Sequence, residues 1–265
     1  MDCPTALTIA GSDSGGGAGL QADLRTFAFQ RVHGASAITC VTAQNTVGVQ
    51  RVDALPPEAV SAQIEAVVTD IGVQGVKTGM LLNEGIIRAV RSAIELYQLQ
   101  PMLVVDPVMV SRTGAQLLDD AAITALKALI PLAAIVTPNR YEAQILSGQE
   151  IHSLDDMKTA AEIIYRQGAN AVLVKGGAMS GEAQGVDVWF DGEALDVLRT
   201  KQVATKNNHG TGCTLSAAIA AQLALGKDLK TAVQTSKTYL TTALEYALNL
   251  GAGSGPVGHF FPLIQ

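Results

Sequence analysis

Short apolar runs alternate with helix-length amphipathic segments along almost the whole sequence. The runs are apolar on both faces, as parallel strands are when they lie buried between two layers of helices. This alternation predicts an α/β fold with a doubly wound, mostly parallel sheet. The expected strands are residues 7–10, 37–42, 75–78, 102–105, 134–137 and 171–174, and the expected helices are residues 20–30, 57–70, 84–99, 121–129, 155–167, 214–225 and 229–248.

One interval departs from this rhythm. Residues 186–190 and 194–198 read as two strands that are joined by an Asp191-Gly192 turn, so we expect an antiparallel edge there. The sequence contains no Pro/Ser-rich linker, internal repeat or low-complexity tract. We therefore expect residues 1–265 to form a single domain.

Composition excludes several classes of function. The chain is 48% hydrophobic and 16% charged, which indicates a compact core. Its net charge is −6 and it has no cluster of basic residues, so we expect no nucleic-acid partner. The apolar stretches are too short to span a bilayer, and the N-terminal residues lack the pattern of a signal peptide. Sparse cysteines at Cys3, Cys40 and Cys213 are typical of reduced thiols, and we expect a cytoplasmic protein without a membrane partner.

The segment NNHGTGC at residues 207–213 comes directly before the expected helix 214–225. Gly210 and Gly212 would let backbone N–H groups approach an anion without a Cβ atom in the way. Cys213 lies at the first turn, where the helix dipole favours a thiolate, so we expect its pKa to be lowered. The segment offers a phosphate cradle with a base or nucleophile beside it. The alternative is a tight loop with a buried structural thiol.

Polar and glycine-rich segments also follow the other expected strands. In open α/β sheets ligands bind outside the carboxyl ends of the strands, so these segments are expected to meet there. The common nucleotide motifs fail, because Leu20 replaces the last glycine of GxGxxG and no P-loop pattern occurs. The segments are residues 11–19, 43–46, 78–80, 106–110, 137–142, 175–178 and 207–213.

Seven short motifs occur in order along the chain. They are GSDSGGGAGLQAD at residues 11–23, AQNT at 43–46, KTGM at 77–80, DPVM at 106–109, TPN at 137–139, KGG at 175–177 and HGTGCT at 209–214. Together they resemble the hydroxymethylpyrimidine and hydroxymethylpyrimidine-phosphate kinases of thiamine biosynthesis, which belong to the ribokinase-like superfamily. The resemblance covers essentially the whole chain, and GPV at 255–257 fits the family's ending. It implies a three-layer α/β/α fold with a short antiparallel edge.

The resemblance implies a kinase that uses ATP and Mg²⁺. Its acceptor would be 4-amino-5-hydroxymethyl-2-methylpyrimidine, phosphorylated first to the monophosphate and then to the pyrophosphate. Cys213 would take the proton of the hydroxyl group, while the backbone amides of Gly210, Thr211 and Gly212 hold the transferring phosphoryl group. The second step starts from an anion and needs no such proton transfer. Because the superfamily often forms dimers, we expect a homodimer.

Five residues are implied as nucleotide or metal contacts. Asn139 and Glu142 match the NxxE pattern for magnesium and phosphate, although the same spacing is typical of a capping box. Asp106 would meet the same magnesium ion through water; a solvated turn residue is the alternative. Lys175 and Lys237, with Asn139 and Glu142, are the expected ATP contacts. The alternatives are a lysine that reaches solvent from a strand end and an ordinary surface lysine.

Gln44 is the expected contact to the pyrimidine. Its amide offers an acceptor beside a donor, which matches a ring nitrogen beside an exocyclic amine; a loop-organising amide is the alternative. Gly11, Asp23, Met80 and Val108 are the other expected substrate contacts. Asp23 could instead decorate the first helix, Met80 could belong to the core and Gly11 could be a plain turn residue.

Two other functions stay open. A pyridoxal or pyridoxine kinase of the same subfamily would share the glycine-rich cysteine loop, but pyridoxal lacks an amine beside a ring nitrogen, so Gln44 favours the pyrimidine. A ligand-sensing module without catalysis could lose the base and the phosphate contacts, whereas Cys213, Asn139 and Glu142 are all present. His209 is expected to stabilise its loop through a hydrogen bond rather than to act as a catalyst.

Overall fold

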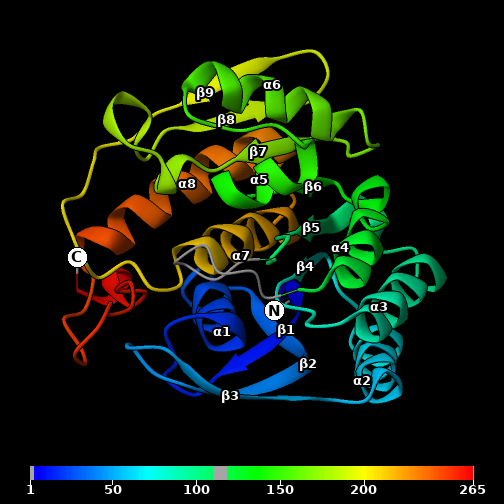
Figure 1. The fold of residues 1–265 in the computed structure, drawn as a ribbon. Coiled ribbons are helices and arrows are strands. Elements are labelled where there is room, and N and C mark those ends of the chain that lie inside the picture. Colours follow the sequence, from blue (N-terminus) through cyan, green and yellow to red (C-terminus); the bar gives the residue numbers. More distant parts are fainter. Residues whose placement is uncertain (1–2, 110–117, 265) are drawn as a thin grey trace.

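Figure 1 shows the computed structural model, which describes residues 3–109 and 118–264. The helices are α1 (Gly19–Phe29), α2 (Pro57–Asp70), α3 (Glu84–Leu96), α4 (Asp120–Lys127), α5 (Arg140–Ser147), α6 (Leu154–Tyr165), α7 (Thr211–Ala224) and α8 (Leu229–Glu245). The strands are β1 (Thr5–Asp13), β2 (His33–Gln44), β3 (Val49–Ala54), β4 (Gly75–Thr78), β5 (Leu103–Val105), β6 (Ile135–Val136), β7 (Val172–Val174), β8 (Asp187–Phe190) and β9 (Leu195–Leu198).

The described residues form a nine-stranded sheet in the order β3-β2-β1-β4-β5-β6-β7-β8-β9. The strands from β2 to β7 in this order run parallel. β3 pairs antiparallel at one edge, and β8 and β9 pair antiparallel at the other. The expected fold, a mostly parallel sheet with an antiparallel edge at residues 186–198, is confirmed.

Helices cover both faces of the sheet (Figure 1), and each face has its own core. The apolar residues of β1 divide between them, because Leu7 and Ile9 belong to the core on the side of α2 to α6 while Ala6 belongs to the core on the side of α1, α7 and α8. Successive strand residues point to opposite faces, so a strand that is apolar throughout fits only between two helical layers. The physical reason for the predicted fold class is therefore visible in a single strand.

The bounds of α2 and β4 agree with the prediction, and most other elements shift by only a few residues at their ends. Strand β3 was not predicted. All six of its residues are exposed, and it is a strand because it pairs with β2, not because its own sequence alternates. Among the described helices, none combines the length and the hydropathy needed to cross a lipid bilayer.

The order of the strands reverses beside β1, which lies between β2 and β4. A crevice opens outside the carboxyl ends of the strands at such a reversal, and ligands bind there. Helix α7 points its N-terminus at this end of the sheet. A Cβ atom on Gly75, at the start of β4, would lie 2.2 Å from the carbonyl oxygen of Ala220 in the second half of α7. Nearer the N-terminus of α7, the hydroxyl of Ser216 donates to the carboxylate of Asp106, which directly follows β5.

Candidate active site

The N-terminus of α7 has backbone N–H groups that no side chain caps. The helix begins at Thr211, three residues before the expected start at 214, and so includes Gly212 and Cys213 in its first turn. Gly210 precedes it with φ +83, and a Cβ atom there would lie 1.9 Å from the carbonyl oxygen of Gly17. The first N–H groups of a helix lack partners within the helix, so this turn can bind an anion.

Asp13 organises the other glycine-rich loop. Its carboxylate accepts hydrogen bonds from the backbone N–H groups of Gly15 (2.8 Å), Gly17 (3.0 Å) and Ala18 (2.8 Å). It also lies 3.0 Å from Nε2 of His209. Burial raises the pKa of Asp13, but the bonds from His209 and from the backbone outweigh burial and lower it. His209 therefore stabilises the loop, as expected.

The C-terminal segment supports residues 207–213 from outside. The backbone N–H of Gly255 donates to Oδ1 of Asn207 (3.1 Å), and the N–H of His209 donates to the carbonyl of Gly255 (3.1 Å). Ser254 Oγ donates to Oδ1 of Asn208 at 3.0 Å. The buried His259 adds a contact of 2.9 Å from Nε2 to Thr214 Oγ1, inside the first turns of α7. Asp13 and Gly255 belong to motifs of the resemblance, but the sequence analysis assigned no supporting role to either of them.

Asp106 and Lys175 form a buried ion pair beside the helix terminus. Lys175 Nζ lies 2.9 Å from Oδ1 of Asp106, and Ser216 Oγ lies 3.0 Å from Oδ2. Burial alone would raise the pKa of Asp106, but Lys175 and then Lys77 lower it overall. A Cβ atom on Gly212 would lie 3.3 Å from Lys175 Nζ, so the lysine faces the first turn of α7. The alternative of a solvated turn residue at Asp106 is wrong, because its side chain is buried.

Asn139 and Glu142 form a capping box at the start of α5. The N–H of Glu142 donates to Oδ1 of Asn139 (3.1 Å), and the N–H of Asn139 donates to Oε2 of Glu142 (2.8 Å). The capping interpretation is thus confirmed. Glu142 is buried, and this burial raises its pKa to about 8; Lys175 opposes the shift and the charge of Asp106 adds to it. Glu142 therefore holds its proton more tightly than an exposed glutamate does.

Cys213 is half-buried in the first turn of α7. The expected lowering of its pKa is wrong for this structure. Burial raises the pKa of the thiol to about 11, and Lys77 opposes the shift without cancelling it. Desolvation disfavours a thiolate more strongly here than the helix terminus favours it. The carboxylates of Asp23 and Asp106 raise the pKa further.

Lys77 is a residue of this site that sequence reasoning missed. It lies in β4 with no exposed side-chain surface, and its Nζ atom lies 2.8 Å from Oδ2 of Asp23. Asp23, expected at the substrate, also has a fully enclosed side chain and accepts a bond of 2.6 Å from Thr8 Oγ1. A lysine inside a short expected strand, after Val76 and directly before the Thr78-Gly79 junction, is the signal that could have identified it.

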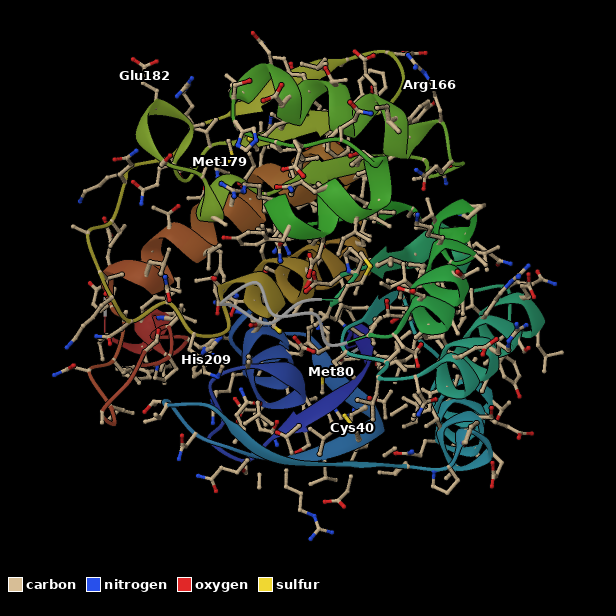
Figure 2. The ribbon with its side chains drawn as sticks, in the orientation of Figure 1. Cys40, Met80, Arg166, Met179, Glu182 and His209 are labelled. Carbon is tan, nitrogen blue, oxygen red and sulfur yellow. The ribbon has the colours of Figure 1, made fainter. Side chains whose placement is uncertain are left out.

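Gln44 ends β2 near the loop of His209. Its Nε2 atom lies 3.3 Å from Nε2 of His209, and its Oε1 atom accepts from Thr42 Oγ1 at 3.2 Å. A Cβ atom on Gly11 would lie 2.7 Å from Cys40 Sγ and 2.9 Å from Met80 Cε. The missing side chain of Gly11 therefore lets Cys40 and Met80, both labelled in Figure 2, pack directly against its backbone.

Val108 is half-buried just after β5. Residue 110, the last of the expected 106–110 segment, lies outside the described residues.

Lys237 lies away from solvent on α8, so the alternative of an ordinary surface lysine is wrong. Its Nζ atom lies 2.6 Å from Oδ2 of Asp187 and 2.9 Å from the carbonyl oxygen of Gly185. The other oxygen of Asp187 accepts from the backbone N–H of Gly176 at 2.9 Å. Lys237 is thus connected to the KGG segment through Asp187. In the described part of the chain no group of three or more His, Cys, Asp or Glu side chains could hold a metal.

Comparison with known proteins gives a consistent picture. The family model described as phosphomethylpyrimidine kinase matches residues 13–258. A hydroxymethylpyrimidine/phosphomethylpyrimidine kinase of Synechococcus elongatus is 56% identical over 99% of this chain and 100% of its own length. The solved pyridoxal kinase of Bacillus subtilis, an ADP complex, has a TM-score of 0.93 at 39% identity and full coverage of both chains. The phosphomethylpyrimidine kinase structure from Clostridium difficile has a TM-score of 0.81 at 44% identity, covering 91% of this chain and 99% of that one.

Proposed function

The chain belongs to the phosphomethylpyrimidine kinase family, and from this premise we propose that it phosphorylates 4-amino-5-hydroxymethyl-2-methylpyrimidine with ATP. The product of the first transfer is the monophosphate and that of the second is the pyrophosphate, which serves thiamine biosynthesis. One observation carries the proposal: Lys175 Nζ lies beside the uncapped first turn of α7, since a Cβ atom on Gly212 would lie 3.3 Å from it. A phosphoryl group needs such a convergence of donors and positive charge.

Each residue then has a role in the transfer. The N–H groups of Gly210, Thr211 and Gly212 bind the oxygens of the transferring group, and the thiolate form of Cys213 accepts the proton of the hydroxyl and becomes the thiol. Gln44 orients the pyrimidine edge, and Gly11, Met80, Val108 and Asp23 surround that ring or support its pocket. Lys175, Lys237 and Asn139 are assigned to the nucleotide side, Lys237 acting through Asp187 and the N–H of Gly176.

Asp106 and Glu142 fit a magnesium ion. Both are buried carboxylates, and the charge of Asp106 helps to raise the pKa of Glu142, so an added cation would relieve their repulsion. Two carboxylates with phosphate oxygens and water are a usual ligand set for Mg²⁺. When bound, the ion supplies neutralisation of the phosphate charge. Asn139 holds the backbone of Glu142 in place through the capping box.

The proposal includes a cytoplasmic homodimer built from one domain. All six residues of β3 are exposed, among them Val49 (51% exposed) and Val52 (41% exposed). An exposed edge strand that carries two valine side chains can pair with a second copy of the chain. The continuous sheet supports a single domain, and the free thiols suit a reducing compartment. Light scattering should give the mass of two chains for the wild type and of one chain for Val49→Asp combined with Val52→Asp.

A pyridoxal kinase activity is the second candidate, favoured by the TM-score of 0.93 to a solved pyridoxal kinase. The test is a steady-state assay of ATP consumption with the pyrimidine, its monophosphate and pyridoxal as separate acceptors, with products identified by mass. We expect the highest kcat/KM for the pyrimidine. A higher value for pyridoxal would reverse the assignment. Tight binding of the pyrimidine without turnover would indicate a sensor instead.

A further inference from the structure

A buried ion pair joins β4 to α1 under the candidate base. The side chains of Lys77 and Asp23 have no exposed surface, and Nζ and Oδ2 lie 2.8 Å apart. Thr8 Oγ1 donates to the same oxygen at 2.6 Å, whereas the other oxygen of Asp23, Oδ1, is buried without a hydrogen-bond partner among the described residues. Buried pairs rarely stabilise a fold better than apolar residues of the same size. This pair therefore calls for a function other than packing.

The geometry brings the ammonium group of Lys77 level with Cys213. β4 and α7 run in opposite directions, because the start of β4 at Gly75 meets Ala220. Two strand residues advance about 6.6 Å and four helix residues about 6 Å, so Lys77 starts level with Ser216. Its side chain extends further in the same direction: a Cβ atom on Gly79 would lie 2.8 Å from its Nζ. That point is level with the first turn of α7.

Charged groups from four elements interact electrostatically with the thiol of Cys213. Lys77 comes from β4, Asp23 from α1, Asp106 from the end of β5 and Lys175 from the end of β7. Burial raises the pKa of the thiol, Lys77 is the strongest group opposing it, and the two carboxylates reinforce it. A base that must ionise in this place depends on the balance between Lys77 and its neighbours.

We propose that Lys77 is a positioning residue that holds a positive charge beside Cys213, and that Asp23 both fixes this charge and limits its action on the sulfur. The inference rests on the proposed function, in which Cys213 is the proton acceptor. It assigns to Asp23 an effect through Lys77, in addition to any role near the substrate. Removal of either partner breaks the same ion pair, yet the two removals change the charge near the sulfur in opposite senses.

The experiment measures the rate at which iodoacetamide alkylates Cys213 as a function of pH, followed by mass spectrometry of the peptide that carries it. This readout separates Cys213 from Cys3 and Cys40 and needs no turnover. In Lys77→Met the midpoint should rise by roughly one pH unit or more, because the stabilising cation is gone. In Asp23→Asn it should fall, because Lys77 retains its charge near Asp106 and the thiolate.

Two further variants serve as matched controls. Lys77→Arg keeps the charge and should return the midpoint towards that of the wild type, since the guanidinium stays protonated. Thr8→Val removes a bond to Asp23 but no charge, and should leave the midpoint unchanged. Circular dichroism identifies variants that fail to fold; if Lys77→Met does so, the direction of the shift in Asp23→Asn decides alone.

The inference is overturned if the midpoint moves in the same direction in Lys77→Met and Asp23→Asn, or if Lys77→Arg shifts it as far as Lys77→Met does. Failure of the proposed function gives a different result. In that case the wild type does not phosphorylate the pyrimidine, whatever the alkylation profiles show. Turnover by the wild type with an unchanged midpoint in Lys77→Met rejects this inference alone.

Discussion

The α-carbon of Gly210 approaches the carbonyl oxygen of Gly17 so closely that a Cβ atom there would lie 1.9 Å from it. Through this contact the two glycine-rich loops, far apart in sequence, form one surface. The loop of Gly17 is fixed by Asp13, which also faces His209 in the other loop. Neither loop can move without displacing its partner.

Gly210→Ala should therefore impair catalysis, and Gly226→Ala provides the matched control. Both glycines have positive φ, +83 and +79, so both variants carry the strain of an L-residue in that conformation, about 1–2 kcal/mol. Only at Gly210 does the new methyl group meet the backbone, because nothing lies within 4 Å of the corresponding position on Gly226. We expect kcat/KM for the pyrimidine to fall by about 10²-fold in the first variant and to stay near wild type in the second. Equal activity in both would refute the contact's role.

Cys213→Ala should reduce kcat for the first phosphorylation by about 10²–10⁴-fold, the usual contribution of a positioned base. The second phosphorylation should lose less, because its acceptor oxygen is already ionised. Single-turnover assays with the alcohol and with its monophosphate compare the two steps directly. An equal loss in both steps would show that Cys213 does not act by removing the hydroxyl proton.

Gln44→Leu should lower the preference of the enzyme for the pyrimidine over pyridoxal as the acceptor. A leucine of similar size leaves the amine and ring nitrogen of the pyrimidine unpaired, at a cost of about 1–3 kcal/mol. We expect kcat/KM for the pyrimidine to fall by roughly 10–100-fold while the value for pyridoxal changes little. Thr42→Val, which removes the hydroxyl 3.2 Å from Gln44 Oε1, is the control for the orientation of the amide. Parallel losses for both acceptors would remove Gln44 as the specificity residue.

His259 should make the protein sensitive to mild acid. Burial lowers the pKa of this side chain to about 4, and the charge of Arg25 contributes to the shift. The pKa of His259 in the folded chain is below the unfolded value of about 6.5. The contribution of the neutral imidazole to the free energy of unfolding is therefore complete above about pH 6.5 and declines as the pH falls towards 4. His259→Gln should lack this decline, which we expect to reach up to about 3 kcal/mol.

Urea unfolding at several pH values provides the measurement, and His33→Gln, at an exposed position, is the control. A wild-type decline that persists unchanged in His259→Gln would assign the effect to other groups.

The predicted part of the fold is the part that periodicity determines. Strands such as Leu103–Val105 are apolar on both faces and helices such as Pro57–Asp70 are amphipathic, so local pattern and global packing agree. β3 was missed because its structure derives from pairing with β2, which no local pattern records. The same limit applies to the start of α7, since the left-handed conformation of Gly210 depends on its contact with Gly17.

The motifs predicted which residues make up the candidate site. They did not predict how the charged groups of the site affect one another. The position of Cys213 in the first helical turn followed from the sequence, but the direction of its pKa shift depends on burial and on Lys77, Asp23 and Asp106. These groups come from separate strands and helices, so their distances to the sulfur are a property of the tertiary fold. Asn139 and Glu142, in contrast, interact within one turn, and their capping box could be predicted from spacing alone.

The hydrogen bond between Gly255 and Asn207 has a consequence for how the chain folds during its synthesis on the ribosome. The two residues are 48 positions apart, so residues 207–213 leave the ribosome well before Gly255, which supports them. A nascent chain halted between these two points would contain the whole sheet and yet lack a supported loop. The phosphate binding that we propose for residues 207–213 would therefore gain its structural support late in translation, after the strands of the sheet have been made.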